Sequence, residues 1–340
     1  MKTKLLSLAS VLAAFNLNAI EIGPTGSGVE MSGFIDLAAQ EQGSGTGTSF
    51  VGQVEVDFDF SSGPVSASVD IDFTESQSLS GSGVYDSNTS TPSEVTGTTG
   101  GNLEEATITY DFGNGFSVTG GKMLTYMGYE AYDPPNMYQY SYAYDIGGLA
   151  LASGEDATGA QMIYDAYDVG MSIDYGTDAF SVGVWTSLEE DAGYELALAF
   201  TGVENFTAKA IFSDFSAPSS GAYEKATYWV SYSMDKLLLA AEIAEADQLD
   251  SGYDIDGFLI MGNYAVSEAV GLTLRYSEME ITGATNTTVA YEGSKFTISP
   301  SYVFNDSFSG LFEYSSYSKD ISSFAAEPED LMAVEFIYAF

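Results

Sequence analysis

Polar and apolar residues alternate along most of the chain. The run from Gln53 to Phe60 reads QVEVDFDF, with polar residues at the odd positions and apolar residues at the even positions. After a turn at Ser61 to Pro64, a second run from Val65 to Phe73 alternates equally well. Because successive side chains of a β-strand point to opposite faces, this pattern predicts strands with one apolar and one polar face.

Comparable runs predict about 16 strands, an even number of the kind found in bacterial outer-membrane barrels. The run 158–175 is overlong for one strand and predicts a bulge, and the run 255–265 alternates poorly. The predicted strands lie at 29–39, 50–60, 64–74, 102–112, 115–123, 158–175, 178–188, 192–201, 204–214, 223–233, 236–246, 255–265, 270–280, 292–303, 307–317 and 331–340.

The connections between these strands are alternately short and long. Gly113-Asn114-Gly115 and Asn305-Asp306 are short, and Asn-Gly pairs close hairpins directly. The long connections include 75–101, a Ser/Thr/Gly-rich tract that we expect to be a mobile extracellular loop. Short periplasmic turns at one end and long extracellular loops at the other are typical of an outer-membrane barrel.

The polar face of the predicted strands is strongly acidic. Burying many unpaired charges in the core of a sandwich is costly, whereas a barrel wide enough to hold water accommodates them in its lumen. The sequence therefore predicts an all-β fold, a transmembrane antiparallel β-barrel whose apolar face meets lipid. The predicted acidic wall of the lumen consists of Glu55, Asp57, Asp59, Asp70, Asp72, Glu105 and Asp111.

Both ends of the chain indicate export to the outer membrane. Residues 1–19 combine a basic start, a short apolar run and a small residue at the exit, as in a secretory signal peptide. We expect cleavage after Ala19 and a barrel spanning 20–340. The chain ends on Phe340, with Phe336 and Tyr338 on the same face of the last strand. This strand resembles the terminal strand of bacterial outer-membrane proteins, which the barrel-assembly machinery recognises.

The charge balance excludes some partners. The chain has 49 acidic residues against nine basic ones, and Lys2 and Lys4 belong to the predicted signal peptide. A surface that binds nucleic acid needs clustered basic residues, so we expect no nucleic-acid partner. The chain has no cysteine and no histidine, which removes disulfides, the commonest general base and the commonest transition-metal ligand.

We therefore expect no enzymatic activity, no cofactor and no bound metal. Outer-membrane phospholipases and omptin-like proteases resemble this fold class, but their sites use a histidine that this chain lacks. The pair Asp57 and Asp59 suits a glycosidase only with one raised pKa and a sugar cleft, and a repeating inward ladder explains the pair better. The acidic segment 247–256 offers oxygen ligands for Ca²⁺ without the spacing of an EF-hand. We expect a solvated loop there, bridged to lipopolysaccharide phosphates by divalent ions.

The few basic residues fall on strands far along the chain from the acidic ones. By alternation, Arg275 points inward, and the sequence predicts a basic wall across the lumen from the acidic wall. The alternative is that these residues lie at the membrane interfaces. The predicted basic wall consists of Lys209, Lys225, Arg275 and Lys295.

One long connection, 124–157, is aromatic as well as rich in Gly and Pro. Tyrosine packs with a large face and a polar tip, glycine permits tight turns, and Pro134-Pro135 stiffens a corner. These properties suit a loop that folds into a water-filled barrel and narrows it. The alternative is an outer loop packed on its neighbours. The predicted constriction consists of Tyr126, Tyr129, Glu130, Tyr132 and Asp133.

The segment from Leu103 to Tyr167 resembles the OmpL-like β-barrel porins. The shared features are a Gly-Lys pair, a Gly-Tyr-Glu triplet, a stretch rich in Tyr and Ser, and a Thr-Gly pair that opens the next strand. In this chain they are Gly121-Lys122, Gly128-Tyr129-Glu130, Asn136 to Ser141, and Thr158-Gly159. The resemblance implies a diffusion channel. In general porins the third long loop, which 124–157 is here, folds into the barrel.

The sequence thus predicts an outer-membrane porin that passes small hydrophilic solutes, with a preference for cations because its lumen is acidic. Its expected partners are outer-membrane lipid and lipopolysaccharide, and resemblance to porins of this size implies a homotrimer. Two alternatives remain open. One is a substrate-selective channel, for example for sugars, with Tyr126, Tyr129, Tyr132 and Tyr138 as a stacking track. The other is a plugged structural or adhesive barrel.

Overall fold

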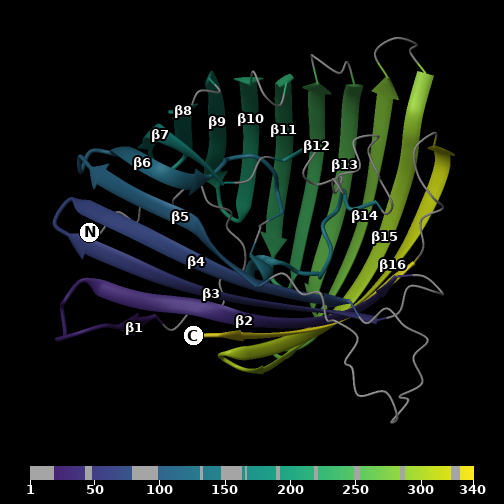
Figure 1. Ribbon diagram of the computed structural model, residues 1–340, viewed down its shortest axis with the longest axis horizontal. Coiled ribbons are helices and arrows are strands. Elements are labelled where there is room, and N and C mark those ends of the chain that lie inside the picture. Colours follow the sequence, from purple (N-terminus) through teal and green to yellow (C-terminus); the bar gives the residue numbers. More distant parts are fainter. Residues whose placement is uncertain are drawn as a thin grey trace, which may run out of the picture.

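Sixteen strands, β2 to β17, form a closed antiparallel barrel (Figure 1), as the sequence predicts. Each strand pairs with its neighbours in the chain, and β17 pairs back with β2 to close the ring. A further two-residue strand, β1, lies beside the start of β2. The computed structural model describes residues 19–42, 48–78, 99–130, 133–146, 163–164, 167–188, 192–217, 221–248, 253–283, 288–322 and 330–340.

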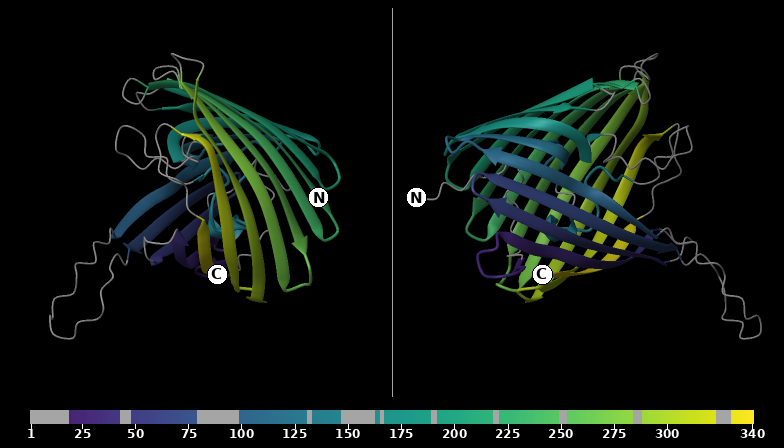
Figure 2. Two further views of the ribbon diagram at one scale, coloured as in Figure 1. Left: turned by 90° about the vertical axis from the view of Figure 1, so that its right-hand side faces the viewer. Right: turned by 60° about the vertical axis from the view of Figure 1, so that its left-hand side comes forward.

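The strands are long and strongly tilted (Figure 2). Their bounds are β1 Ile20–Glu21, β2 Val29–Gln42, β3 Thr48–Ser62, β4 Val65–Ser78, β5 Thr99–Asp111, β6 Phe116–Leu124, β7 Tyr167–Gly176, β8 Phe180–Ser187, β9 Ala192–Val203, β10 Phe206–Ala217, β11 Gly221–Met234, β12 Leu237–Gln248, β13 Tyr253–Ala265, β14 Val270–Gly283, β15 Thr288–Asn305, β16 Phe308–Ser322 and β17 Leu331–Ala339. A short 3₁₀ turn, η1, covers Pro134–Asn136. Among the described residues, no helix is long and apolar enough to cross a membrane.

Most strands differ from their predicted bounds by a few residues, and two predictions need correction. The strand predicted at 158–175 begins only at Tyr167, because Ile163 and Tyr164 pack as buried residues inside the barrel. Residues 75–78 and 99–101 of the predicted loop 75–101 extend β4 and β5, and 79–98 lie outside the described residues. The predicted signal peptide, up to Asn18, also lies outside them.

Tight turns close the barrel strands at one end. Gly63, with φ of +62°, lies in the turn between β3 and β4, and Asn205 adopts φ of +62° between β9 and β10. In the turn after β5, the Gly113 amide donates a 2.7 Å hydrogen bond to Asp111 Oδ1. Positive φ is the geometry that two-residue hairpins require, so Gly, Asn and Asp occupy these positions.

The outer face of the barrel is apolar. Along β17, Met332, Val334, Phe336 and Tyr338 are exposed, and the residues between them are buried. Near the turn after β15, the rings of Phe304 and Phe308 stack with their centroids 4.8 Å apart. An apolar outer band flanked by aromatic rings is the surface that a membrane-spanning barrel presents to lipid.

The hairpin of β5 and β6 depends on a glycine whose backbone other residues do not adopt. Gly121 has φ of +141°, and a Cβ there would lie 1.9 Å from the Ala106 carbonyl oxygen. At the neighbouring Gly120, the nearest atom to an added Cβ is Met171 Cγ at 3.7 Å. The two adjacent glycines therefore differ in their tolerance of a methyl group.

We expect Gly121→Ala to lower the free energy of unfolding by at least about 2 kcal/mol, because strained backbone costs about 1–3 kcal/mol and the methyl group meets a carbonyl. Gly120→Ala is the matched control and should behave like the native protein. The measurement is the urea midpoint of the folded, heat-modifiable band on gels. Equal midpoints for the two variants would contradict the prediction.

Candidate functional site

The chain that follows β6 enters the barrel. We call residues 125–146 the inner loop, of which 125–130 and 133–146 are described. Figures 1 and 2 show it crossing the interior between β6 and the far wall. It packs on the inner faces of β9 to β15, together with Ile163 and Tyr164. The buried apolar cluster that results contains Met127, Tyr129, Ala143, Tyr144, Ile146, Ile163, Tyr164, Ala197, Ile211, Trp229, Ala240, Ala244, Ala246, Ile255, Leu259, Met261, Met279, Ile281 and Tyr291.

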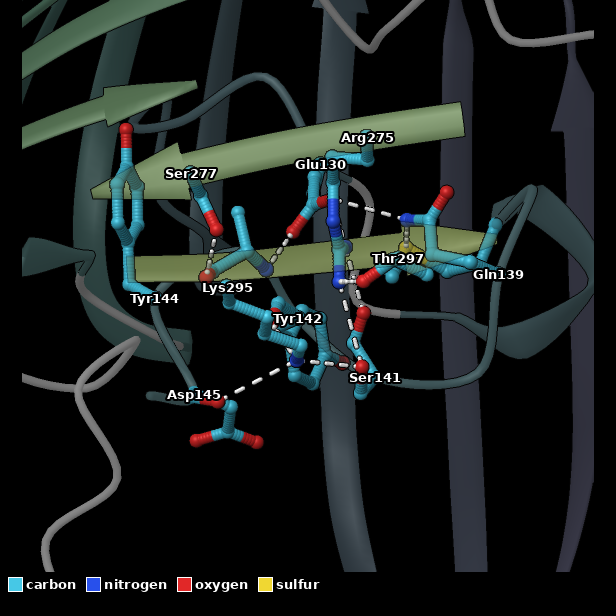
Figure 3. Close-up of polar contacts among 12 residues, drawn as sticks. Glu130, Gln139, Ser141, Tyr142, Tyr144, Asp145, Arg275, Ser277, Lys295 and Thr297 are labelled. Carbon is cyan, nitrogen blue, oxygen red and sulfur yellow. Dashed lines mark hydrogen bonds and ion pairs between the residues drawn. The ribbon is translucent and has the colours of Figure 1, made fainter. Parts of the chain in front are cut away.

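A buried ion pair fixes the middle of the inner loop (Figure 3). Arg275 Nη1, from β14, lies 2.5 Å from Glu130 Oε1, and both side chains are at most 1% exposed. The other Glu130 oxygen accepts a 2.6 Å hydrogen bond from the Ala143 amide. Gln139 Nε2 donates to Glu130 Oε1 at 2.9 Å. Both oxygens of the carboxylate therefore have partners, which a buried charge requires.

Ser141 is the second anchor of the inner loop. Its hydroxyl donates to Glu313 and accepts hydrogen bonds from Lys295 Nζ at 2.5 Å and from Arg275 Nη2 at 3.2 Å. Its amide donates to Glu313 Oε2 at 3.0 Å, and its carbonyl accepts from Arg275 Nη1 at 2.6 Å. Lys295 Nζ also donates to the Tyr142 carbonyl at 2.8 Å. Ser141 thus provides hydrogen-bond partners for side chains on β14, β15 and β16.

The charges of this buried network balance. Two cations, Arg275 and Lys295, face two anions, Glu130 and Glu313, and each of the four has a hydrogen-bond partner within the network. Burial raises the pKa of Asp145, at the end of the inner loop, and the nearby charges of Lys295 and Arg275 oppose that rise. Charges removed from water are tolerated only when they are paired and hydrogen-bonded, and the network meets both conditions.

Further hydrogen bonds hold the two ends of the inner loop. At its start, the Tyr126 amide donates to Glu195 Oε2 at 2.9 Å, and the Tyr126 hydroxyl donates to Asp174 at 2.7 Å. Towards its end, the hydroxyls of Tyr144 and Tyr164 donate to Glu242 of β12. The inner loop is therefore fixed along its length to the wall formed by β9 to β16.

The opposite wall carries carboxylates in rows across β3, β4 and β5. In one row, Asp57 pairs in register with Asp70, which pairs with Glu105. In the next row, Glu55 pairs with Asp72. Hydroxyl groups donate to several of these carboxylates, with Ser32 to Asp57 at 3.2 Å and Ser68 to Asp59 at 3.0 Å. We call this surface the acidic wall.

One loop residue faces the acidic wall. Burial raises the pKa of Asp133 to about 7, and the charges of Glu104 and Asp57 raise it further in the same direction. The side chain therefore lies close to β3 and β5, although the rest of the inner loop is fixed to the opposite wall. The structure thus brings Asp133 close to the carboxylates of the acidic wall.

The predicted constriction residues have different surroundings. Tyr129 is 4% exposed and packs edge-on against Trp229, with ring centroids 5.4 Å apart. Tyr126 is hydrogen-bonded to Asp174, and Glu130 is buried in the ion pair. Asp133 faces the acidic wall, and Tyr132 lies outside the described residues.

The predicted acidic wall is largely assembled. Glu55, Asp57, Asp59, Asp70, Asp72 and Glu105 lie in register on three neighbouring strands. Asp111 does not join them, because it caps the turn after β5.

The residues of the predicted basic wall have two kinds of surroundings. Arg275 and Lys295 point inward but are 1% exposed, since the inner loop covers them and bonds to them. Lys209 Nζ lies 5.0 Å from the centre of the Trp229 ring, and Lys225 Nζ lies 4.4 Å from that of Tyr223. Two of the four cations therefore stabilise the inner loop on its wall.

Several site residues escape simple alternation. Glu104 is an extra residue in β5, because Asp70 pairs with Glu105 and Ile71 with Leu103. Such a bulge changes the side-chain direction, and no alternation count reveals it. Glu242 and Glu313 do alternate inward. Their hydrogen-bond partners are Tyr144 and Tyr164 for Glu242 and Ser141 for Glu313, and none of these lies on a barrel strand. The poor alternation of 255–265 was a usable signal, because Ile255, Leu259 and Met261 face the loop.

Two cavities lie beside the inner loop and the acidic wall. One, of about 300 Å³, is lined by Glu30, Asp59, Ser66, Ser68 and Thr109 near the turn after β3. The other, of about 330 Å³, lies between η1 and the turn ends of β13 to β17. The first continues the acidic wall towards the end of the barrel that carries the tight turns.

Solved outer-membrane proteins share this architecture. OmpF of Salmonella typhi, in a complex with daunomycin, matches with a TM-score of 0.62 at 11% identity, covering 95% of this chain and 100% of that chain. The anion-selective porin of Comamonas acidovorans matches with a TM-score of 0.62 at 12% identity, covering 92% and 99%. A loop L8 deletion mutant of OmpT, an outer membrane protein of Vibrio cholerae, matches with a TM-score of 0.62 at 15% identity, covering 92% and 99%.

Neither a family model nor a curated protein matches the sequence. At these identities the likeness shows the fold alone. The chain has the 16-stranded barrel fold of outer-membrane porins.

The buried pair allows a test of how the inner loop is held. We expect Glu130→Gln to lower the free energy of unfolding by about 3–5 kcal/mol, because it leaves a buried guanidinium without its counter-charge. The inner loop, rich in tyrosine, should also be cut faster by chymotrypsin. The measurements are the urea midpoint and the cleavage rate of the folded protein in detergent.

Glu204→Gln, in the exposed turn after β9, is the matched control and should change neither value. The double variant Glu130→Gln/Arg275→Met removes both charges and should cost less than Glu130→Gln alone. Unchanged cleavage of Glu130→Gln would show that the ion pair does not hold the loop.

Proposed function

We propose that the protein is a porin of the outer membrane that lets small hydrophilic solutes and ions diffuse through a constricted, cation-preferring lumen. One observation carries the proposal. The inner loop covers and pairs Arg275 and Lys295 on one wall. On the other side Asp133 lies beside the carboxylates of the acidic wall, where Lys122 acts on Glu104 but the carboxylates outnumber it.

The electrostatic argument concerns the charges that a permeating ion meets. A charge 4 Å from an ion contributes about 1 kcal/mol in water and more where the protein lowers the dielectric. A single carboxylate at that distance therefore changes the local cation concentration by roughly fivefold. Paired, buried charges such as Arg275 and Glu130 contribute little to this field. The net field of the lumen is that of the acidic wall.

The comparison structures support the assignment by fold, and selectivity must come from the walls. One solved porin of this fold is described as anion-selective, so the barrel itself does not decide the sign of the preferred ion. The proposal includes location in the outer membrane, contact with lipid and lipopolysaccharide, and no catalytic step. It also includes a homotrimer, because one solved form of Vibrio cholerae OmpT is described as a trimer. Kinship with the OmpL-like porins remains part of the proposal.

One observation favours an alternative, the plugged barrel. The inner loop buries a large apolar cluster inside the lumen, and a loop packed so extensively narrows the passage. The sugar-selective alternative has less support, because Tyr126 and Tyr129 pack and bond within the protein and do not form an open stacking track. Conductance separates a narrowed channel from a plug.

We expect the refolded mature chain to form open channels in planar bilayers, with a reversal potential of cation-selective sign in a salt gradient. Asp70→Asn should lower the ratio of cation to anion permeability by up to about fivefold, because one wall carboxylate is lost. Glu204→Gln removes a charge outside the lumen and serves as control. Silent bilayers with properly folded protein would favour the plug.

The preference should depend on pH. Burial and neighbouring carboxylates raise the pKa of Asp133 to about 7, so its charge is present above that pH and is lost as the pH falls through it. We expect cation preference to decline between about pH 8 and pH 6. In Asp133→Asn, cation preference should no longer decline over this pH range. If the variant shows the same decline as the native protein, Asp133 is not its cause.

The same shift affects stability with a defined sign. Because the pKa of Asp133 is raised above its ordinary value of 3.8, the folded state binds this proton more tightly than the unfolded chain does. Its contribution to stability is fully present below about pH 4 and is lost as the pH rises through about 7. Urea midpoints of the native protein and Asp133→Asn across this range measure the contribution.

A further inference from the structure

Three carboxylates of the acidic wall converge on one point. Glu55 of β3, Asp72 of β4 and Glu104 of β5 each place an oxygen within 4.8 Å of the other two. Glu55 and Asp72 are direct partners in the ladder. Like charges opposite each other in a sheet are destabilising, so this arrangement requires compensation.

The bulge in β5 brings the third carboxylate to this point. A regular strand would alternate Glu104 away from Glu105, but the extra residue lets both side chains act on the same wall. Bulges commonly redirect a side chain at a functional site. The irregular strand and the like-charge pair of Glu55 and Asp72 are therefore two unfavourable features at the same place.

Glu55 gives an independent indication of a missing ligand. Its side chain is 6% exposed, and among the described residues its Oε2 atom has no hydrogen-bond partner. In the neighbouring row, Ser32 donates to Asp57 and Thr107 donates to Glu105, although Asp57 Oδ1 also has no partner among the described residues. A buried carboxylate oxygen without a donor indicates an unoccupied bonding position, and the Glu55 carboxyl lies within hydrogen-bonding reach of Glu104, where a shared proton or a cation would bind.

The surroundings add negative charge. Asp57 and Asp133 lie near enough to act on Glu55, and Asp57 and Asp72 act on Glu104. Lys122 is the cation that acts on Glu104, but its Nζ already donates to the Leu103 carbonyl at 2.7 Å. One monovalent cation does not balance five carboxylates. Protons or a divalent cation would offset part of the remaining negative charge.

We propose that Glu55, Asp72 and Glu104 form a binding site for one calcium ion on the acidic wall, near Asp133. Calcium takes six to eight oxygen ligands at about 2.3–2.6 Å, so oxygens on opposite sides of the ion are about 4.6–5.2 Å apart. The three oxygens lie within 4.8 Å of one another, so one ion can reach all three. Water in the lumen completes the shell. This proposal departs from the expectation of no bound metal, because the bulge that brings Glu104 to the site is invisible to alternation.

Binding would change the field that permeating ions meet. A divalent ion on the acidic wall offsets two of the charges next to Asp133, so calcium would weaken cation preference and narrow the passage. This consequence rests on the proposed channel function, whereas binding itself does not. The two are therefore tested separately.

The binding test uses calorimetric titration of CaCl₂ into the folded, detergent-solubilised mature chain at pH 7.5, and luminescence of bound Tb³⁺. Tyr167 lies close enough to Glu104 and Glu55 to interact electrostatically with them, so its ring is placed to sensitise Tb³⁺. We expect one saturable site per chain, with a Kd of about 10⁻⁴–10⁻³ M, as in weak extracellular calcium sites. Glu55→Gln and Glu104→Gln should each weaken it at least tenfold.

Asp59→Asn is the matched control, because Asp59 belongs to the same strand and wall but not to the group of three. It should leave calcium affinity within a factor of two. Two results would overturn the proposal: weak, unsaturable uptake that is the same in all variants, or no uptake because the cluster shares protons. Using both Gln variants keeps the test decisive if one of them does not fold.

The channel test compares reversal potentials in KCl gradients with 1 mM EGTA and with millimolar CaCl₂. The native protein should lose cation preference when calcium is added, and Glu55→Gln should not respond. If calcium binds but no channel opens, the site stands and the channel function fails. If channels open but calcium neither binds nor shifts the potential, the site fails and the channel function stands.

Discussion

The structure depends on the charge-matched contact between Glu130 and Arg275 inside the barrel. Both groups have left water, and each is tolerated only because the other, together with Ser141, Lys295 and Glu313, completes its bonding. This requirement fixes where the inner loop lies. The position of the loop in turn decides which strands face protein and which face the lumen.

The barrel therefore has two different interiors. On β9 to β15 the inward residues are apolar or buried, and Gly257 leaves space for the Tyr144 ring, which a Cβ would approach to 2.7 Å. On β3 to β5 the inward residues are carboxylates. Arg275 and Lys295 are paired on the first side, whereas on the second side the carboxylates outnumber Lys122, the cation that acts on Glu104. Ion preference and calcium binding are both proposals about that second side.

The sequence predicted the barrel well, because the physics that sets it is local. Polar and apolar residues alternate strictly in β3 and β4, because one face of these strands meets lipid and the other meets water. They do not alternate in β13, because its inner face packs on the inner loop and is apolar as well. The direction of Arg275 was predictable, but its partner was not, since Glu130 lies far away in the chain. Glu104 was missed because a bulge leaves no trace in a polar–apolar pattern. The predicted strand 158–175 wrongly included Ile163 and Tyr164. Apolar residues occur both in strands and in loops buried inside a barrel, so their hydrophobicity does not distinguish the two.

The apolar side chains that β9 to β15 point inward bear on the order in which the barrel assembles. Without the inner loop, those strands would expose hydrophobic side chains to water on one side and to lipid on the other. The ring cannot first form as a water-filled tube and admit the loop afterwards without passing through that state. We therefore expect the inner loop to lie against these strands before the barrel closes. The pairing of β2 with β17 would then close the ring around a loop that is already in place.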